Sequence, residues 1–258
     1  MTRAQLQRLE ERWRAYVDRF SVDGKLHPMH QLKLEHTVRV AADARAIAKG
    51  MAWTEGEVNL ADAVGLCHDI ARFPQFKKYN SFSDVDTVDH GDLGFQTLEA
   101  ENLLDGLNDE PCALILHSVQ YHNKKELPRI LSAREEKHLR LIRDADRIDI
   151  FFICWDSIRS GLIHENPELA IGVKFDGPPT EVVLDQFDRG EAIHYKNLKT
   201  MADRFVLQLS WMHDLSYDAS KRLVRERSIL EKFIDVLPVK TDRMMACFEA
   251  TEAFLAVA

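Results

Sequence analysis

The sequence has little of what marks membrane, secreted or nucleic-acid-binding proteins. No apolar run reaches the length that crosses a bilayer, and residues 1–20 (MTRAQLQRLEERWRAYVDRF) predict an amphipathic helix rather than a signal peptide. Acidic residues outnumber basic ones by 42 to 34, which gives a formal net charge of −8, and no long Lys/Arg run is present. A nucleic-acid polymer and a membrane are therefore not expected as partners, and a cytoplasmic location is expected.

Cysteine is scarce as well, and no two cysteines are spaced as a Cys-x-x-Cys pair. Buried free thiols in a reducing cytoplasm best explain this scatter. Cys67 adjoins the most informative stretch of the chain, and we expect it to serve in packing, since free cysteine is a common buried residue. The four cysteines are Cys67, Cys112, Cys154 and Cys247.

Two common catalytic motifs are missing. The chain has no Gly-rich loop of the kind that cradles phosphates, so ATP-driven chemistry is not indicated. It also has no Gly-x-Ser-x-Gly nucleophile elbow, which argues against a Ser-His-Asp hydrolase. Any enzymatic activity must therefore depend on other residue types.

Helical periodicity is present instead, along nearly all of the 258 residues. Apolar side chains recur at three- and four-residue steps, and no segment alternates as a strand would. We therefore expect an all-α protein with one domain over residues 1–258. The expected helices cover about 4–20, 28–50, 54–69, 90–104, 109–122, 132–158, 180–188, 197–214, 218–236 and 241–257.

Several helix starts and one long loop can be predicted from local signals. Pro28 suits a first helical position, while residues 54–57 (TEGE) and 132–135 (SARE) have the pattern of capping boxes. Residues 73–89 show no period, which predicts a long loop and a candidate lid. Within it, the acidic and aromatic segment 79–89 lies between candidate ligands and has a position suited to gating a substrate.

Six side chains of metal-ligand type lie on, or at the end of, the expected helices. Four imidazoles and two carboxylates suit Mn, Fe, Co, Ni or Zn better than Ca or Mg. The set is too large for one four-coordinate zinc ion and suits two ions that share a bridging carboxylate. Five separate helices contribute, as in bundle proteins that build metal sites from facing side chains. The six residues are His36, His68, Asp69, His90, His122 and Asp146.

In their local context these residues resemble the HD-domain superfamily of metal-dependent phosphohydrolases. The histidines at 90 and 122 are similar to those of the branch that holds two metals. The resemblance covers about 28–160, and the tail after 160 resembles the helical extension of a bacterial group of HD proteins of unassigned substrate. The segments that carry it are 33–40 (KLEHTVRV), 68–73 (HDIARF), 89–91 (DHG), 121–123 (YHN) and 144–149 (DADRID).

The resemblance implies an all-α HD bundle with additional C-terminal helices, and a ligand set for two ions. His36, His68, Asp69 and Asp146 would hold one ion, and Asp69 would bridge to a second ion held by His90 and His122. A hydroxide between the ions would then attack a small phosphoester or nucleotide.

Five basic residues are candidate phosphate-binding groups. Arg72 lies three residues after Asp69, where the family usually has Lys or Arg near the phosphate, and it counts with Asp69 as a catalytic candidate. Lys33 and Arg147 are further candidates for binding the substrate, and Lys77 and Lys78 could also contact the phosphate.

Some assignments stay open at this point. Asp144 competes with Asp146 as the ligand, because both cannot easily face inward from one helix; the Ala-Asp-Arg-Ile context favours Asp146. Asp149 could contact a ligand or the substrate, and His117 could line the cavity. A di-iron oxygenase of HD type and a non-catalytic ligand-binding or signalling module are the alternative functions. Homo-oligomerisation is open too, because the first and last helices could pack at an internal or a subunit interface.

Overall fold

The computed structural model describes residues 1–128 and 131–257, and over this range the protein is all-α, as predicted. Within these residues the only β-type pairings are two isolated bridges, Val22 with Lys25 and Lys174 with Thr200. No helix in the described part of the chain is both long and apolar enough to cross a membrane.

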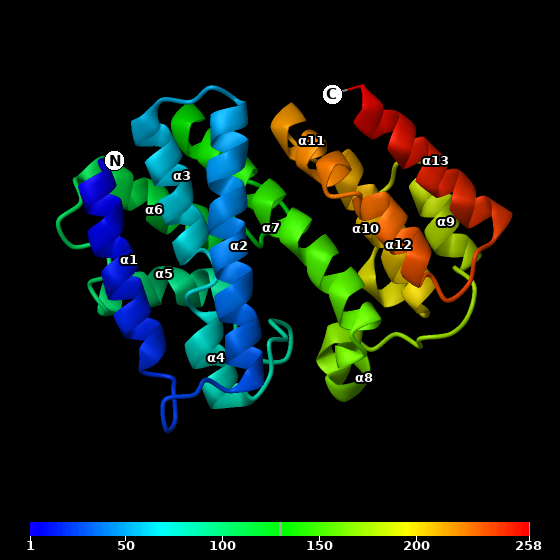
Figure 1. The fold of residues 1–258 in the computed structure, drawn as a ribbon, viewed down its shortest axis with the longest axis horizontal. Helices are drawn as coiled ribbons and strands as arrows, with labels where there is room; N and C mark the ends of the chain where they lie inside the picture. Colours follow the sequence, from blue (N-terminus) through cyan, green and yellow to red (C-terminus); the bar gives the residue numbers. More distant parts are fainter. Residues whose placement is uncertain (129–130, 258) are drawn as a thin grey trace. The chain divides into compact units, whose positions relative to one another are not determined.

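The chain forms two compact units, Met1–Asp149 and Ile150–Ala258, and α7 crosses the boundary between them. The expectation of one domain over the whole chain stays a prediction. The first unit, coloured blue to green in Figure 1, contains α1 (Arg3–Asp18), α2 (Pro28–Gly50), α3 (Glu55–Cys67), α4 (Arg72–Tyr79), α5 (His90–Ala100), α6 (Asp109–Tyr121) and most of α7 (Ala133–Arg159).

The first unit is built on the pair α2 and α3, which pack along much of their length (Figure 1). Their close approach depends on Gly65, because a Cβ atom at this position would lie 2.6 Å from the Cα atom of Ala41. Helix α1 covers α3 with the buried side chains of Leu6, Leu9 and Trp13. Helices α5 and α6 pack against each other, and α6 also contacts α3. The end of α3 is thereby enclosed by neighbouring helices.

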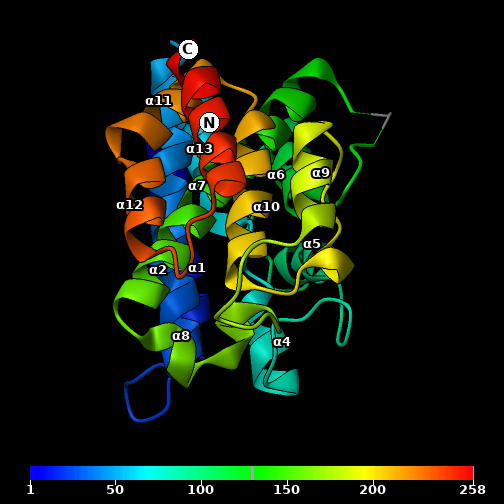
Figure 2. The same ribbon diagram turned by 90° about the vertical axis from the view of Figure 1, so that its right-hand side faces the viewer.

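The second unit has its own core around α10, which packs against both α9 and α13 (Figure 2). Phe205 and Phe233 are fully buried there, with ring centroids 4.9 Å apart. The elements after α7 are α8 (Leu162–Glu165), the 3₁₀ turn η1 (Pro167–Ala170), α9 (Glu181–Asp188), the 3₁₀ turn η2 (Tyr195–Asn197), α10 (Met201–His213), α11 (Asp218–Glu226), α12 (Ile229–Val236) and α13 (Asp242–Ala256).

The helix predicted over 218–236 is interrupted in the structure. Ser228 has a φ of 51°, in the left-handed region, and separates α11 from α12. The apolar residues on either side keep a helical period, so the sequence pattern does not reveal the break.

The loop predicted over residues 73–89 is wrong for its first part, because α4 runs to Tyr79. Phe73 and Phe76 are three residues apart and both buried, which gives this short helix an apolar face. Pro74 does not interrupt it, since proline is tolerated in the first turn of a helix. The loop proper therefore spans residues 80–89.

The two expected capping boxes have different outcomes. At the start of α7, Ser132 and Glu135 exchange the predicted hydrogen bonds between side chain and backbone. At the start of α3, Thr54 makes no side-chain cap. Glu57 instead accepts hydrogen bonds from Arg134 and His138 of α7. The carboxylate thus connects two helices rather than closing a local box.

Candidate metal centre

The structure brings the six predicted ligand side chains together in the first unit. His36 lies on α2 and Asp146 on α7, while His90 is the first residue of α5. His68 and Asp69 follow the end of α3, and His122 caps the end of α6. Five of the six are buried, and the side chain of Asp146 is 22% exposed.

One group of donor atoms surrounds Nε2 of His36. This nitrogen lies 3.3 Å from Nε2 of His68 and 3.4 Å from Oδ2 of Asp69. Oδ1 of Asp146 lies 3.2 Å from the same nitrogen and 3.7 Å from Nε2 of His68. Two imidazoles and two carboxylates therefore converge on one point, and the first three of these residues form a group able to hold a metal ion.

A second group lies on the other side of Asp69. Nε2 of His90 is 3.0 Å from Nε2 of His122. Oδ1 of Asp69 lies 3.5 Å from the first of these nitrogens and 3.9 Å from the second, and the three residues also form a group able to hold a metal. Asp69 turns Oδ2 toward His36 and Oδ1 toward His90, so its carboxylate has the orientation of a bridge.

The far nitrogen of each histidine faces an acceptor. A carbonyl or carboxylate oxygen can only accept a hydrogen bond, so each Nδ1 carries the proton. Such support orients metal-binding imidazoles in other proteins. The acceptors are Asp149 Oδ2 for His36 (2.6 Å), the Gly65 carbonyl for His68 (2.7 Å), Asp84 Oδ2 for His90 (2.5 Å) and the Val119 carbonyl for His122 (2.7 Å).

Because the Nδ1 protons are bonded to these acceptors, the Nε2 lone pairs of the four histidines face one another. They also face the carboxylates of Asp69 and Asp146. Without a positive charge between them, this arrangement is repulsive, because it holds acceptors with few protons to share. A cation removes the repulsion, and an imidazole-rich donor set with carboxylates suits a divalent transition metal. The donor set therefore fits the ions expected from the sequence.

The pKa shifts of these histidines also favour a positive charge among the donor atoms of the first group. Burial and Lys33 act to lower the pKa of His36, but hydrogen bonds to Asp146, Asp149 and Asp69 raise it to about 10. The positive charge that these carboxylates stabilise on His36 is one that a metal ion could supply. In the second group, burial and the neighbouring His90 and His68 lower the pKa of His122 to about 3, which keeps its ring neutral.

Two cations flank Asp69. Nζ of Lys33 lies 2.7 Å from Oδ2 of Asp69, and Nε of Arg72 lies 3.4 Å from Oδ1. Burial acts to raise the pKa of Asp69, but Lys33, His68 and the hydrogen bond to His36 hold it well below its usual range. Asp69 is therefore an anion at neutral pH.

Arg72 is also tied to the 80–89 loop. Its Nη1 donates to the carbonyl of Phe82 (2.7 Å) and to Oδ1 of Asp84 (2.9 Å). Its Nη2 has no hydrogen-bond partner among the residues that the structure describes. The loop thus fixes one edge of the guanidinium and leaves another nitrogen available to a ligand.

Asp84 is a site residue that the sequence analysis missed. Its carboxylate connects Arg72 to His90 and also accepts from Asn123 (3.2 Å) and Gln75 (3.2 Å). Hydrogen bonds to His90 and the charge of Arg72 lower its pKa, although burial acts in the opposite direction. It lies in an acidic loop with no period, and only its position between candidate ligands could have drawn attention to it.

The remaining sequence candidates take different positions. Asp149 contacts His36 and also pairs with Arg39 (2.6 Å), so it orients a candidate ligand. His117 bonds to Glu135 (2.6 Å) and belongs to neither metal-type group. Cys67 is buried, which raises its pKa to about 12, and it packs as expected.

Asp144 and Arg147 flank Asp146 on α7. Asp144 is 1% exposed and also lies outside both metal-type groups, whereas Asp146 faces His36. Arg147 is half-buried on the same helix, and its binding of a substrate stays a prediction.

The comparison with known families bears on this unit directly. The family model described as HD domain matches residues 34–150, a segment that contains all six candidate ligands. No curated protein matches the chain. No solved structure matches it either. The match supports an HD domain over residues 34–150, as the sequence motifs indicated, and the HD-domain superfamily consists mostly of metal-dependent hydrolases.

Proposed function

We propose that the first unit is a metal-dependent phosphohydrolase that acts on a small phosphoester or a nucleotide. The observation that carries the proposal is the convergence of four imidazole Nε2 atoms on both oxygens of Asp69, with a cation on each side of that carboxylate. In this proposal His36, His68, Asp69 and Asp146 hold one ion, and Asp69, His90 and His122 hold the other.

Two bound divalent ions would supply Lewis-acid polarisation of a phosphoryl oxygen and a water of lowered pKa. The protein's own groups have separate tasks. Asp69 holds its two oxygens apart in fixed directions, and the Nδ1–H bonds prevent the imidazoles from rotating. The buried position of the histidines limits the access of bulk water.

Lys33 and Arg72 are the proposed phosphate-binding groups. Both lie against Asp69, so a phosphate bound beside that carboxylate would have two positive groups within reach. The unpartnered Nη2 of Arg72 offers directed N–H donors, and a guanidinium suits the oxygens of a phosphate. Charge that builds up on the phosphate during hydrolysis would be offset by these groups.

A di-iron oxygenase of HD type is the second candidate. The observation in its favour is the donor set itself, since four imidazoles with two carboxylates suit iron as well as zinc or manganese. The two functions differ in what they require: hydrolysis proceeds with redox-inactive ions, whereas oxygenation needs iron and consumes dioxygen.

The test is phosphate release by metal-free protein reconstituted separately with Mn, Fe, Co, Ni and Zn. The substrates are a panel of nucleotides and small phosphoesters. Asp69→Ala is the disabled variant, and Glu35→Ala, an exposed neighbour of His36, is the matched control. Release by the wild type and the control, but not by Asp69→Ala, supports the hydrolase.

Two other outcomes would overturn it. If no substrate of the panel released phosphate, and the protein retained two irons and consumed dioxygen, the result would favour the oxygenase. If no phosphate were released and no metal were bound, the result would favour a ligand-binding module.

A further inference from the structure

The first unit contains a cavity that is lined by none of the six candidate metal ligands. Its volume is about 510 Å³, within the range of small-molecule sites. It lies where the end of α1, the turn before α2 and the end of α4 meet. The lining residues are Arg19, Phe20, Ser21, Val22, Lys25, Leu26, His27, His30, Phe76, Lys77 and Asn80.

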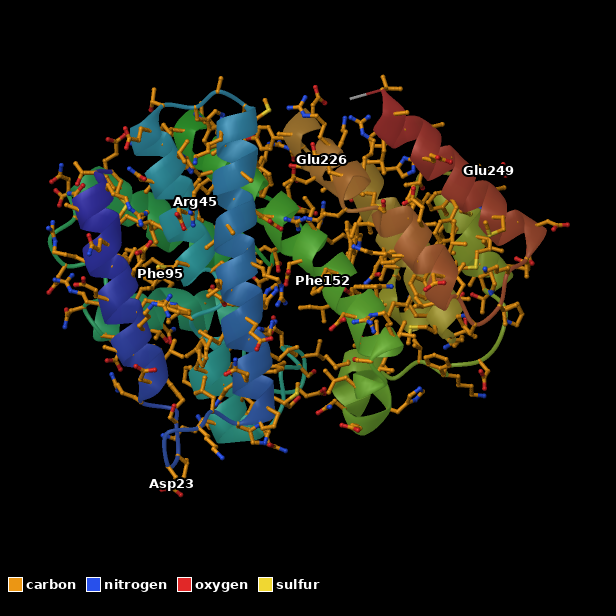
Figure 3. All side chains as sticks on the ribbon, in the orientation of Figure 1. Asp23, Arg45, Phe95, Phe152, Glu226 and Glu249 are labelled. Carbon is orange, nitrogen blue, oxygen red and sulfur yellow. The ribbon has the colours of Figure 1, made fainter. Side chains whose placement is uncertain are left out.

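The lining of this cavity is positively charged, although the chain as a whole is acidic. Three of the lining residues are Arg or Lys and none is Asp or Glu, in a protein whose formal net charge is −8. Arg19 is already paired with Glu101 (2.5 Å), so Lys25 and Lys77 are the cations without a carboxylate partner among the described residues. Figure 3 shows Asp23, in the same turn as Lys25, at the tip of the turn and pointing away from the helices. The cavity therefore favours an anion.

Its walls are aromatic. The ring centroids of His27 and Phe76 are 5.0 Å apart, and those of His30 and Phe76 are 5.3 Å apart. Phe20 lies 5.5 Å from His30, and Nζ of Lys77 lies 5.5 Å from the centre of the Phe20 ring. Rings beside a cation form a surface on which a planar group can stack while its charged substituent reaches the lysine.

His30 adds a polar feature of its own. It is 4% exposed, and its Nε2 donates to the carbonyl of Phe73 (3.0 Å), so Nδ1 is an acceptor. That Nδ1 is buried and has no hydrogen-bond partner. A buried polar atom without a partner is costly, so a ligand that offers a donor at this end of the cavity would recover that cost.

We propose that this cavity is a binding site for an aromatic anion of nucleotide size, separate from the metal centre. The ring would lie against Phe20, His27 and Phe76, and the anionic group would lie between Lys25 and Lys77. A donor group on the ring would form a hydrogen bond with Nδ1 of His30. The proposal does not depend on the function proposed above, because it uses none of the residues assigned there.

The probe is adenosine 5′-monophosphate, which carries a planar ring, an amino donor and a phosphate. Its binding is measured by calorimetry with the full chain carrying Asp69→Ala, so that hydrolysis at the metal centre cannot consume it. Adenosine presents the ring without the charge, and inorganic phosphate presents the charge without the ring. We expect one saturable nucleotide site per chain at this cavity, besides any nucleotide that Lys33 and Arg72 still hold at the metal centre. Adenosine and inorganic phosphate should each bind the cavity about tenfold more weakly, since each loses part of the contact energy.

Two single substitutions locate the site. Lys77→Glu reverses a charge that lines the cavity, and we expect it to weaken nucleotide binding at least about tenfold. Lys78→Glu makes the same change one residue away, at an exposed side chain that does not line the cavity, and should leave binding unchanged.

Equal weakening by both substitutions would mean non-specific attraction and overturn the proposal. The absence of saturable binding at millimolar nucleotide would do so as well. Neither result bears on phosphate release by the metal-loaded wild type, so the two proposals can fail separately.

Discussion

Oδ2 of Asp84 lies 2.5 Å from Nδ1 of His90, while Oδ1 of the same carboxylate lies 2.9 Å from Nη1 of Arg72. One residue of the 80–89 loop therefore supports both a proposed metal ligand and the proposed phosphate-binding arginine. Burial acts to raise the pKa of Asp84, but the hydrogen bond to His90 and the charge of Arg72 lower it, so Asp84 is an anion in these contacts at neutral pH. The order of the loop and the order of the second ligand group are thus linked.

Asp84→Ala should weaken the second group selectively. Removing the acceptor frees the His90 ring to rotate, and loss of such support in metal sites typically costs about 10–100-fold in metal affinity. The first group uses Asp149 and the Gly65 carbonyl as its acceptors, so its affinity should change little. Titration with zinc against a chromophoric chelator resolves the two sites.

Asp86→Ala is the matched control for this experiment. Asp86 belongs to the same loop, but its carboxylate accepts from Ser83 and contacts neither His90 nor Arg72. It should take up zinc as the wild type does. If Asp84→Ala also titrated like the wild type, the supporting role of Asp84 would be refuted.

Gly65→Ala should disturb the packing that positions His36 and His68. The added Cβ would lie 2.6 Å from the Cα of Ala41, which is backbone and cannot move aside alone. Overpacking of this kind costs about 1–3 kcal/mol of the free energy of unfolding. Because α2 carries His36 and α3 leads into His68, separating these helices should also weaken the first ligand group.

Chemical denaturation and metal titration of this variant measure the two effects. Gly56→Ala is the control within the same helix, since its nearest neighbour would be at 3.4 Å, an ordinary contact. Alanine is the better helix former, so this variant should be as stable as the wild type or more stable. Equal behaviour of the two variants would contradict the argument from close approach.

The sequence was sufficient for most of the long helices and for the HD-domain resemblance, because both depend on local patterns. Helix α2 begins at Pro28 and ends at Gly50, as predicted from the proline and the apolar period. The HD motif is carried by short segments whose residue order could be read directly.

What could not be predicted depends on contacts between distant residues. Glu57 has the right spacing for a capping box with Thr54, but Arg134 and His138, 77 and 81 residues away, hold its carboxylate. Asp84 lies six residues from His90 in a segment without a period, and nothing local shows that its carboxylate turns back to that ring. A tertiary hydrogen bond leaves no spacing rule in the sequence.

The burial of His138, which bonds to Glu57, should make stability depend on pH. Burial lowers the pKa of His138 from 6.5 to about 4, so the folded state holds this ring neutral where the unfolded state takes up a proton. Its contribution is therefore present above pH 6.5 and is lost as the pH falls toward about 4. Burial acts to raise the pKa of Glu57, but Arg134 and His138 lower it, so protonation of Glu57 adds to the loss only at lower pH.

Denaturant unfolding between pH 7.5 and pH 4.5 measures this effect. In the wild type, His138 should contribute a slope of up to about 1.4 kcal/mol per pH unit. His138→Gln cannot titrate and should have a flatter profile, whereas His194→Gln, at an exposed histidine, should follow the wild type. Parallel profiles for all three proteins would show that the neutral buried ring contributes nothing to acid sensitivity.

Metal ions should stabilise the first unit, and the ions should differ in effect. The Nε2 atoms and carboxylates converge only in the folded state, so an ion that binds them raises the free energy of unfolding. At a free-ion concentration of 100 times the dissociation constant, the gain is about 2.7 kcal/mol per site. Zinc or manganese should therefore raise the midpoint of thermal unfolding, whereas calcium, which prefers oxygen ligands, should raise it far less.

Asp69→Ala should lose most of the zinc effect, because the carboxylate of Asp69 contacts both groups of donor atoms. A calcium effect as large as that of zinc, or a full zinc effect in Asp69→Ala, would mean that the ions act elsewhere on the chain.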